Sequence, residues 1–337
     1  MALTDTLSTA DGPDSGFNSA VSLLQLVRSM RSTDFRVAED YQSIWQTANR
    51  INWNIQDLIG GDKRLNFTQP FLPDALVGIN TIQCLNNEEK LKLNQIRGNS
   101  YLSLFGLCEE FILPSVVEHI NQIRWNNLYA TQAFLHFAEE ESKHILLFQR
   151  FAEDFEQGFG TVCECIGPTH TICDRILNHH PLAVALTTLH IEWMTQRHYL
   201  ESVRDNQGLD PQFCRLLRYH WLEEAQHAKL DALMVQDIAR SLSPEEIKGA
   251  IADYFTIVDL LDQGLQQQVQ LDLESLSRAT NRWFSDVERT EIQTIQIQSY
   301  RWTFLWSGMT HQNVGRIFNE IYPSSETLLL EKAKNFG

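Results

Sequence analysis

Two Glu-x-x-His sequences stand out as residues that could bind metal. They are Glu141-Ser-Lys-His144 and Glu224-Ala-Gln-His227. Both lie in segments with strong helical periodicity, where residues three positions apart share one face of the helix. One such match could arise by chance. The information therefore lies in what surrounds the pair.

A glutamate precedes each motif at nearly the same distance. Glu110 lies 31 residues before Glu141, and Glu192 lies 32 residues before Glu224. The chain thus repeats a helix that carries one Glu followed by a helix that carries Glu-x-x-His. This is the ligand set of a carboxylate-bridged dinuclear site in a four-helix bundle.

All four glutamates lie among apolar residues at helical spacing. Four carboxylates buried together would repel one another and would have to take up protons. Two iron ions would compensate these charges. Carboxylate oxygens and imidazole nitrogens suit iron, with manganese a weaker alternative, and the set contains no thiolate that would indicate a softer metal.

The choice between Glu109 and Glu110 depends on helical phase. Glu110 shares a face with the apolar residues Leu107 and Val117. Pro114, four residues later, also removes the helical hydrogen bond to the carbonyl of Glu110, and such breaks often mark ligand sites. We therefore expect Glu110 to be the ligand. Solvated surface positions are expected for Glu109, Glu139, Glu140 and Glu223.

A third histidine, His220, lies one helical step before Glu224 and gives the sequence His-x-x-x-Glu-x-x-His. From His220 to His227 the helix axis advances about 10 Å, so long side chains can converge on one metal from both ends. The alternative is a core histidine. Asp231, one turn beyond His227, could accept the free N–H of that imidazole, or it could be an ordinary surface residue.

The complete pattern resembles the diiron N-oxygenases typified by p-aminobenzoate N-oxygenase, over about residues 87–240. Those enzymes have a third histidine at the position that His220 occupies here. The resemblance implies dioxygen activation at a two-iron centre and oxidation of an amine towards hydroxylamine, nitroso or nitro. It also implies that Glu141 and Glu224 bridge the metals. One iron would then be completed by Glu110 and His144, and the other by Glu192, His220 and His227.

The same resemblance implies a small-molecule substrate with O2 as co-substrate. The chain contains no GxGxxG, Rieske or flavin signature, so electrons are expected from an external donor, a reductase or a ferredoxin. Two rival functions remain open. One is hydroxylation or desaturation of a carbon substrate by the same centre. The other is iron handling as in ferritins, which are shorter and lack the third histidine.

Composition excludes several function classes. The 337 residues carry a formal net charge of −16, which argues against nucleic-acid binding and against docking on an anionic membrane. The polar, acidic N-terminus does not resemble a signal peptide, and no long uninterrupted apolar run predicts a membrane span. Six cysteines without metal-site spacing fit reduced thiols, so a cytoplasmic location is expected. The oligomeric state stays open, with a homodimer as one option.

The elements that must position these residues are all helical. We expect a disordered lead over 1–17 and a single all-α domain over 18–337, with a ferritin-like bundle at about 87–240 as its core. The loops are expected at 52–73 and 158–180. The helices are expected at 18–32, 36–51, 87–122, 126–157, 181–203, 210–240, 244–271, 284–298 and 300–318.

Overall fold

The computed structural model describes residues 35–123 and 127–337. Helices connected by short loops build this part of the chain, and no strand occurs within it. The predicted all-α fold, with a ferritin-like four-helix core and additional helices, is confirmed. The predicted lead over 1–17 and the predicted helix over 18–32 lie outside the described residues.

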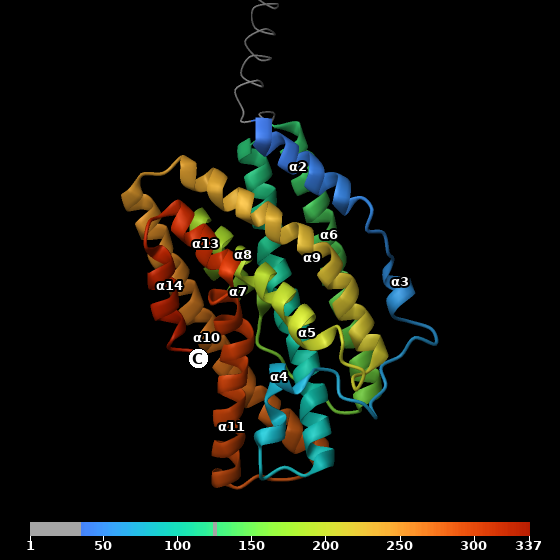
Figure 1. The fold of residues 1–337 in the computed structure, drawn as a ribbon. Helices are drawn as coiled ribbons and strands as arrows, with labels where there is room; N and C mark the ends of the chain where they lie inside the picture. Colours follow the sequence, from blue (N-terminus) through green and yellow to red (C-terminus); the bar gives the residue numbers. More distant parts are fainter. Residues whose placement is uncertain (1–34, 124–126) are drawn as a thin grey trace, which may run out of the picture.

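Four long helices form the core of the molecule (Figure 1). They are α5 (Asn87–Ile123), α6 (Leu128–Phe159), α8 (Pro181–His198) and α9 (Pro211–Arg240). The helix α5 packs along α6, and α8 packs along α9; these two hairpins meet through contacts of α6 with α9 and of α5 with α8. The predicted bundle helices are therefore present, close to their expected bounds.

Local sequence explains where these helices begin. The side chain of Asn127 accepts hydrogen bonds from the first backbone N–H groups of α6, and Asp210 does the same for α9. Ser243 and Glu246 form a capping box at the start of α10 (Pro244–Thr280). This helix continues nine residues beyond its predicted end at 271.

The central helix α8 is buried on nearly every side. A helix surrounded by protein must satisfy its polar side chains internally. Accordingly, the hydroxyls of Thr187, Thr188 and Thr195 donate to backbone carbonyls four residues earlier. Glu192 lies on this same buried helix, and its carboxylate therefore requires a partner inside the bundle.

The crossover between the two hairpins contains a short helix, α7 (Thr169–Leu177), where we expected only a loop. Glycine, proline and paired histidines near both ends of this segment obscured the pattern. Between them, Cys173 and Ile176 share a face one turn apart, and both are buried. The helix packs on α5 and closes the outer side of that helix.

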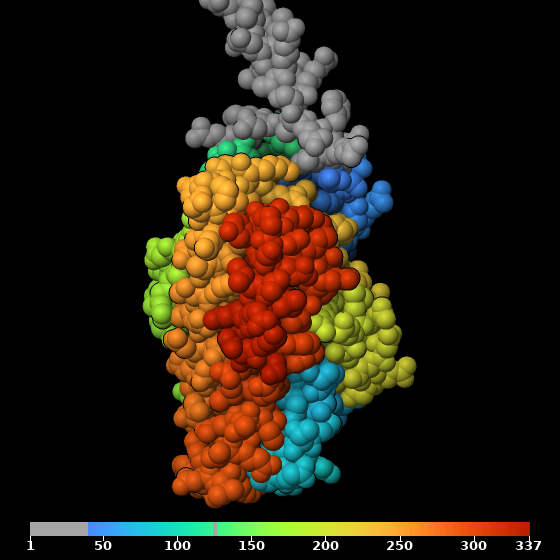
Figure 2. All heavy atoms as spheres, turned by 60° about the vertical axis from the view of Figure 1, so that its left-hand side comes forward, coloured from blue at the N-terminus to red at the C-terminus, as the bar shows by residue number. Residues whose placement is uncertain are grey.

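Additional helices surround the bundle. On one side α2 (Phe35–Ala48) packs on α6 and α9, and on another α10 packs on α5 and α8. Figure 2 shows the C-terminal segments lying over the 240–300 region. The remaining described elements are α3 (Ile55–Leu58), α4 (Asp74–Val77), the 3-10 helix η1 (Ile79–Thr81), α11 (Asp286–Arg301), α12 (Ser307–Met309), α13 (Gln312–Ile321) and α14 (Ser325–Ala333).

Two short π-helices interrupt the α-helical pattern. The first, η2 (Tyr199–Val203), continues α8, and the second, η3 (Trp302–Trp306), follows α11. The predicted helix over 300–318 is therefore divided into η3, α12 and α13 rather than continuous. π-Helical turns are rare and occur frequently at functional sites.

Among the described residues, one helix, α5, is long and apolar enough to cross a membrane by length and composition. Within its apolar window, 61% of the residues are buried inside the protein. Such burial is usual for the core helix of a bundle, and α5 also carries a buried glutamate into the bundle interior.

Candidate metal centre

The four bundle helices direct carboxylates and imidazoles into one buried cluster. Each helix contributes at least one group, and all of these side chains are almost completely inaccessible to solvent. The cluster residues are Glu109 from α5, Glu141 and His144 from α6, Glu192 from α8, and His220, Glu224 and His227 from α9. Six of the seven residues expected at the site are thus brought together.

The exception is Glu110, whose place in the cluster is taken by Glu109. Only 2% of Glu109 is exposed, and it continues a buried stripe with Phe105, Ile112 and Val116 on α5. Of the two apolar residues that favoured Glu110, Leu107 is buried, but Val117 is 45% exposed. The predicted phase of this helix was therefore wrong by one residue.

Glu110 itself lies towards α7 instead of the bundle interior. Burial and the nearby charge of Glu110 raise the pKa of the Cys173 thiol to about 11. Pro114 does not end α5, which continues to Ile123 as one helix. The proline thus had no bearing on which glutamate enters the core.

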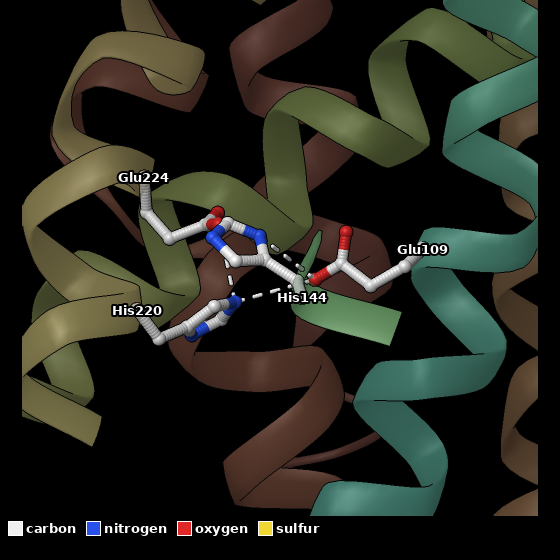
Figure 3. A group of neighbouring side chains, drawn as sticks. All are labelled: Glu109, His144, His220 and Glu224. Atoms are coloured by element: carbon white, nitrogen blue, oxygen red, sulfur yellow. Dashed lines mark hydrogen bonds and ion pairs between the residues drawn. The ribbon is translucent and has the colours of Figure 1, made fainter. Parts of the chain in front are cut away.

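One half of the cluster is formed by Glu109, His144, His220 and Glu224, whose ligand atoms all lie within 4.8 Å of one another (Figure 3). Nε2 of His220 lies 3.2 Å from Oε1 of Glu109 and 3.1 Å from Oε1 of Glu224. Nδ1 of His144 lies 3.1 Å from that same Glu224 oxygen. Two imidazoles and two carboxylates therefore face a common point.

The other half is formed around His227. Its Nδ1 lies 2.7 Å from Oε1 of Glu141, 3.4 Å from Oε1 of Glu224 and 3.9 Å from Oε1 of Glu192. Glu141, Glu224 and His227, together with His144, form a second group with metal-ligand spacing. Glu224 and His144 belong to both halves, so two ions bound here would be close neighbours.

The placement of His220 differs from what the resemblance implied. It was expected to share a metal with Glu192 and His227. In the structure it contacts Glu109 and lies against His144, with ring centroids 4.6 Å apart. The third histidine thus belongs to the Glu109 half.

The unsatisfied atoms of the cluster fit metal ions. Seven buried ligand atoms form no hydrogen bond of acceptable geometry among the described residues, although several of them lie close to one another. A buried polar atom left in this state costs free energy unless another group compensates it. Cations at these positions would satisfy all seven. The atoms are Oε2 of Glu109, both carboxylate oxygens of Glu141, Nδ1 of His144, Oε2 of Glu192, Oε1 of Glu224 and Nδ1 of His227.

The protonation of the cluster reflects the same crowding. Burial and the charge of Glu224 raise the pKa of Glu192 well above its ordinary value. Burial alone would lower the pKa of His227, but the charges of Glu141 and Glu224 reverse this effect and raise it. Without metal, the protein would therefore hold protons where cations would otherwise bind. Metal binding must displace them.

Two further glutamates hold the metal-facing histidines from behind. Nε2 of His144 on α6 lies 2.8 Å from Oε2 of Glu223 on α9. Reciprocally, Nε2 of His227 on α9 lies 2.9 Å from Oε2 of Glu140 on α6. Such contacts fix the tautomer and leave each Nδ1 free to bind metal. Lys143 donates a hydrogen bond to Glu223 at 2.5 Å and so anchors that carboxylate.

These outer carboxylates were missed at the level of sequence. Glu109, Glu140 and Glu223 were interpreted as solvated, yet all three are buried, and only Glu139 is exposed. The available signal was the doubled Glu-Glu-x-x-His sequence, in which the first Glu of each motif serves the histidine of the other.

Asp231 does not accept from His227, because Glu140 occupies that position. It is nevertheless no surface residue. Its carboxyl is fully buried, and neither oxygen has a hydrogen-bond partner within the described parts of the chain. Burial raises its pKa well above the ordinary value, so we expect the neutral acid.

An apolar cleft of about 170 Å³ lies between α5, α8 and α10. Cys108 and Ile191 line it, and they are the sequence neighbours of Glu109 and Glu192. Other lining residues, including Leu261 from α10, are mostly aliphatic. The cleft therefore offers an apolar cavity on the side of the bundle that carries the two single-glutamate helices.

Comparison with known proteins gives little further information. No protein-family model matches this chain, and no curated protein is significantly similar to it. Among solved structures, a variant of an R2-like ligand-binding oxidase with aerobically reconstituted Mn/Fe cofactor is 13% identical, with a TM-score of 0.43 over 78% of this chain and 92% of that chain. A second variant, with Fe/Fe cofactor, is 14% identical, with a TM-score of 0.42 over the same shares. Similarity this low supports no argument about function.

The corrected phase of α5 gives a direct prediction. Glu109→Ala should reduce metal binding strongly because it removes a carboxylate from the cluster. Glu110→Ala is the matched control, since Glu110 lies outside the cluster, and it should bind metal like the wild type. Metal analysis after anaerobic loading measures both. Loss of metal in Glu110→Ala but not in Glu109→Ala would show that Glu110 is the ligand.

The outer carboxylates give a second prediction. Glu223→Gln and Glu140→Gln should each weaken metal binding by about 10- to 100-fold, because the imidazole that each orients loses its charged partner. Glu139→Gln changes an exposed neighbour and should have no effect. Competition with a chelator measures the affinities. Equal affinities in all three variants would show that the reciprocal contacts do not support the site.

Proposed function

We propose that the protein is a non-haem diiron oxygenase that oxidises the nitrogen of an amine. The observation that supports this most strongly is the convergence of seven unsatisfied ligand atoms in a buried cluster of glutamates and histidines. A surface acidic patch could hold cations adventitiously. A core arrangement with this desolvation cost is better explained by resident metal ions.

The residues of this chain would bind two metal ions as follows. Glu109 and His220 would hold one ion, and Glu192 and His227 the other. Glu224 and His144 lie between the halves, and Glu141 is placed with the second group. Bound reduced iron would supply the electrons that activate O2, and O2 would supply the oxidising power. The same oxygen and nitrogen ligands would also accept manganese at one or both positions.

The surroundings of the cluster support a reaction that must exclude water. Phe137 stacks on His227 with ring centroids 4.0 Å apart, and Trp53 stacks on His144 at 6.3 Å. These rings close the histidine side of the site. The apolar cleft is lined by Cys108 and Ile191, the sequence neighbours of Glu109 and Glu192. It would receive the substrate, and a small aromatic amine could lie against its aliphatic walls.

The proposal of oxidation at nitrogen, rather than carbon, rests on the third histidine, which the N-oxygenases that this pattern resembles also have. His220 adds a neutral donor beyond the Glu-and-Glu-x-x-His ligands that a carboxylate-bridged site of this kind otherwise has. A nitrogen ligand in place of water or carboxylate would change the reactivity of one ion. The aliphatic lining of the cleft would equally suit a carbon substrate, so hydroxylation is the alternative that a test must include.

The decisive experiment is turnover of an aryl amine by iron-loaded protein. Wild type, supplied with reductant and O2, should convert p-aminobenzoate to its hydroxylamine, nitroso or nitro product, as measured by mass spectrometry. His220→Ala should bind iron but lose this conversion. His119→Leu, which alters a buried histidine outside the cluster, should retain it.

A product hydroxylated on carbon would favour the alternative reaction. Iron uptake with no oxidation of either kind would contradict an oxygenase. Identical turnover in wild type and His220→Ala would contradict the role of the third histidine.

A further inference from the structure

A continuous line of rings leads away from the metal cluster along α5. The ring of His220 contacts Phe105 edge-to-face, with centroids 5.6 Å apart. Phe105 in turn lies 4.6 Å from Tyr101, one helical turn earlier. All three side chains are buried. Tyr101 is therefore separated from a cluster histidine by a single aromatic ring.

The hydroxyl of Tyr101 has a specific partner. It lies 3.0 Å from Nδ1 of His198, and Nε2 of the same imidazole lies 3.0 Å from Oγ of Ser307. Since Ser307 donates to the carbonyl of Thr303, its oxygen can accept from Nε2–H. This leaves Nδ1 of His198 as the acceptor for the phenol. Burial lowers the pKa of His198 to about 3, consistent with a neutral ring.

From His198 the line of rings continues to two tryptophans near the surface of the molecule. Trp302 stacks on His198 with centroids 6.2 Å apart, and Trp306 stacks on Trp302 at the same spacing. Both tryptophans are only partly buried. The guanidinium of Arg197 lies over both rings and is ion-paired with Glu201, which offsets its charge.

The backbone here departs from regular α-helix on both sides of the contact. The π-helix η2 begins immediately after His198, and η3 spans the two tryptophans from Trp302 to Trp306. In a regular α-helix these side chains would point in other directions about the helix axis. Two π-helical segments at one contact between rings are unusual, because such turns are rare and associated with function.

We propose that Tyr101, His198 and Trp302 form an electron relay between an external one-electron donor and the metal centre. The donor would be of the class of reduced iron–sulfur proteins. This inference rests on the proposed function, because an oxygenase centre buried inside a helical bundle must receive its electrons through the surrounding protein.

Electrons and protons balance in each step of the relay. Reaction of bound iron with O2 would supply an oxidant strong enough to take one electron from Tyr101. The phenol proton would move to Nδ1 of His198, which leaves a neutral tyrosyl radical. Trp302 then gives one electron to this radical as the proton returns from His198 to the phenolic oxygen. The donor finally reduces the tryptophan radical cation. The net result is one electron moved from the donor to the centre, with no net proton transfer.

The relay can be tested by the radical that forms when reduced, iron-loaded protein reacts with O2. Anaerobically reduced protein is mixed with O2 in the absence of amine and freeze-quenched, and tyrosyl radical is detected by electron paramagnetic resonance. The radical yield should fall several-fold in Tyr101→Phe, and the radical should persist several-fold longer in Trp302→Phe. No amine oxidation is needed for this measurement, so its failure and that of the proposed function are distinguishable.

Matched controls come from the same chain. Tyr254 is also buried and also hydrogen-bonded to a histidine, with its hydroxyl 3.0 Å from Nδ1 of His190. It lies outside the relay, so Tyr254→Phe should give the same radical yield and lifetime as the wild type. Trp283, which is 92% exposed, provides the control Trp283→Phe. Equal radical yields and lifetimes in the relay variants and the controls would overturn the proposal.

A second measurement does not require metal. Protein without added metal is photo-oxidised with a ruthenium polypyridyl complex and a sacrificial acceptor, and tyrosyl radical is detected by electron paramagnetic resonance. The yield should fall in Tyr101→Phe and in Trp302→Phe, but not in Tyr254→Phe. Circular dichroism confirms that each variant is folded. An unchanged yield in both relay variants would contradict electron transfer along this path.

Discussion

The repulsion among the buried carboxylates of Glu109, Glu141, Glu192 and Glu224 is the constraint on which the rest of the structure depends. Each would be ionised in water, and burial removes the solvation that stabilises the charge. In the absence of cations the cluster retains protons, as the raised pKa of Glu192 indicates. Positive charge bound among these carboxylates would therefore stabilise the bundle. Two metal ions would supply that charge in place of protons.

The architecture serves this requirement at successive distances from the cluster. Four helices bring the donors together, and the reciprocal contacts of Glu140 and Glu223 orient two histidines so that Nδ1 faces inward. Beyond them, aromatic rings such as Phe137 exclude water. The added helices α2 and α10 cover opposite sides of the bundle and leave an apolar cleft on the α10 side. The same packing produces the line of rings that ends at Trp302.

Much of this could be predicted from sequence, because helical periodicity and paired motifs are local signals. The bundle helices and six of the cluster residues followed from the spacing of two Glu-x-x-His sequences. The choice between Glu109 and Glu110 could not be made reliably, because adjacent residues differ by about 100° of helical phase and both faces of α5 carry apolar residues. Only the packing of α7 and α6 around α5 decides which face is interior.

Contacts between residues far apart in the chain likewise could not be predicted from the sequence. Glu223 serves a histidine 79 positions away, and nothing local distinguishes it from a solvated glutamate. The short helix α7 was missed because glycine and proline flank its single buried turn. The π-helix η3 was missed because its residues fit an α-helical pattern as well. In each case tertiary packing, rather than propensity, determined the outcome.

The central claim is that this cluster is a dinuclear metal centre. Anomalous diffraction at the iron absorption edge, from crystals grown after anaerobic iron loading, tests it most directly. We expect two peaks inside the bundle, one beside Glu109 and His220 and the other beside Glu192 and His227, with Glu224 between them. A single peak, or iron bound only at the surface while the cluster stays empty, would contradict the account.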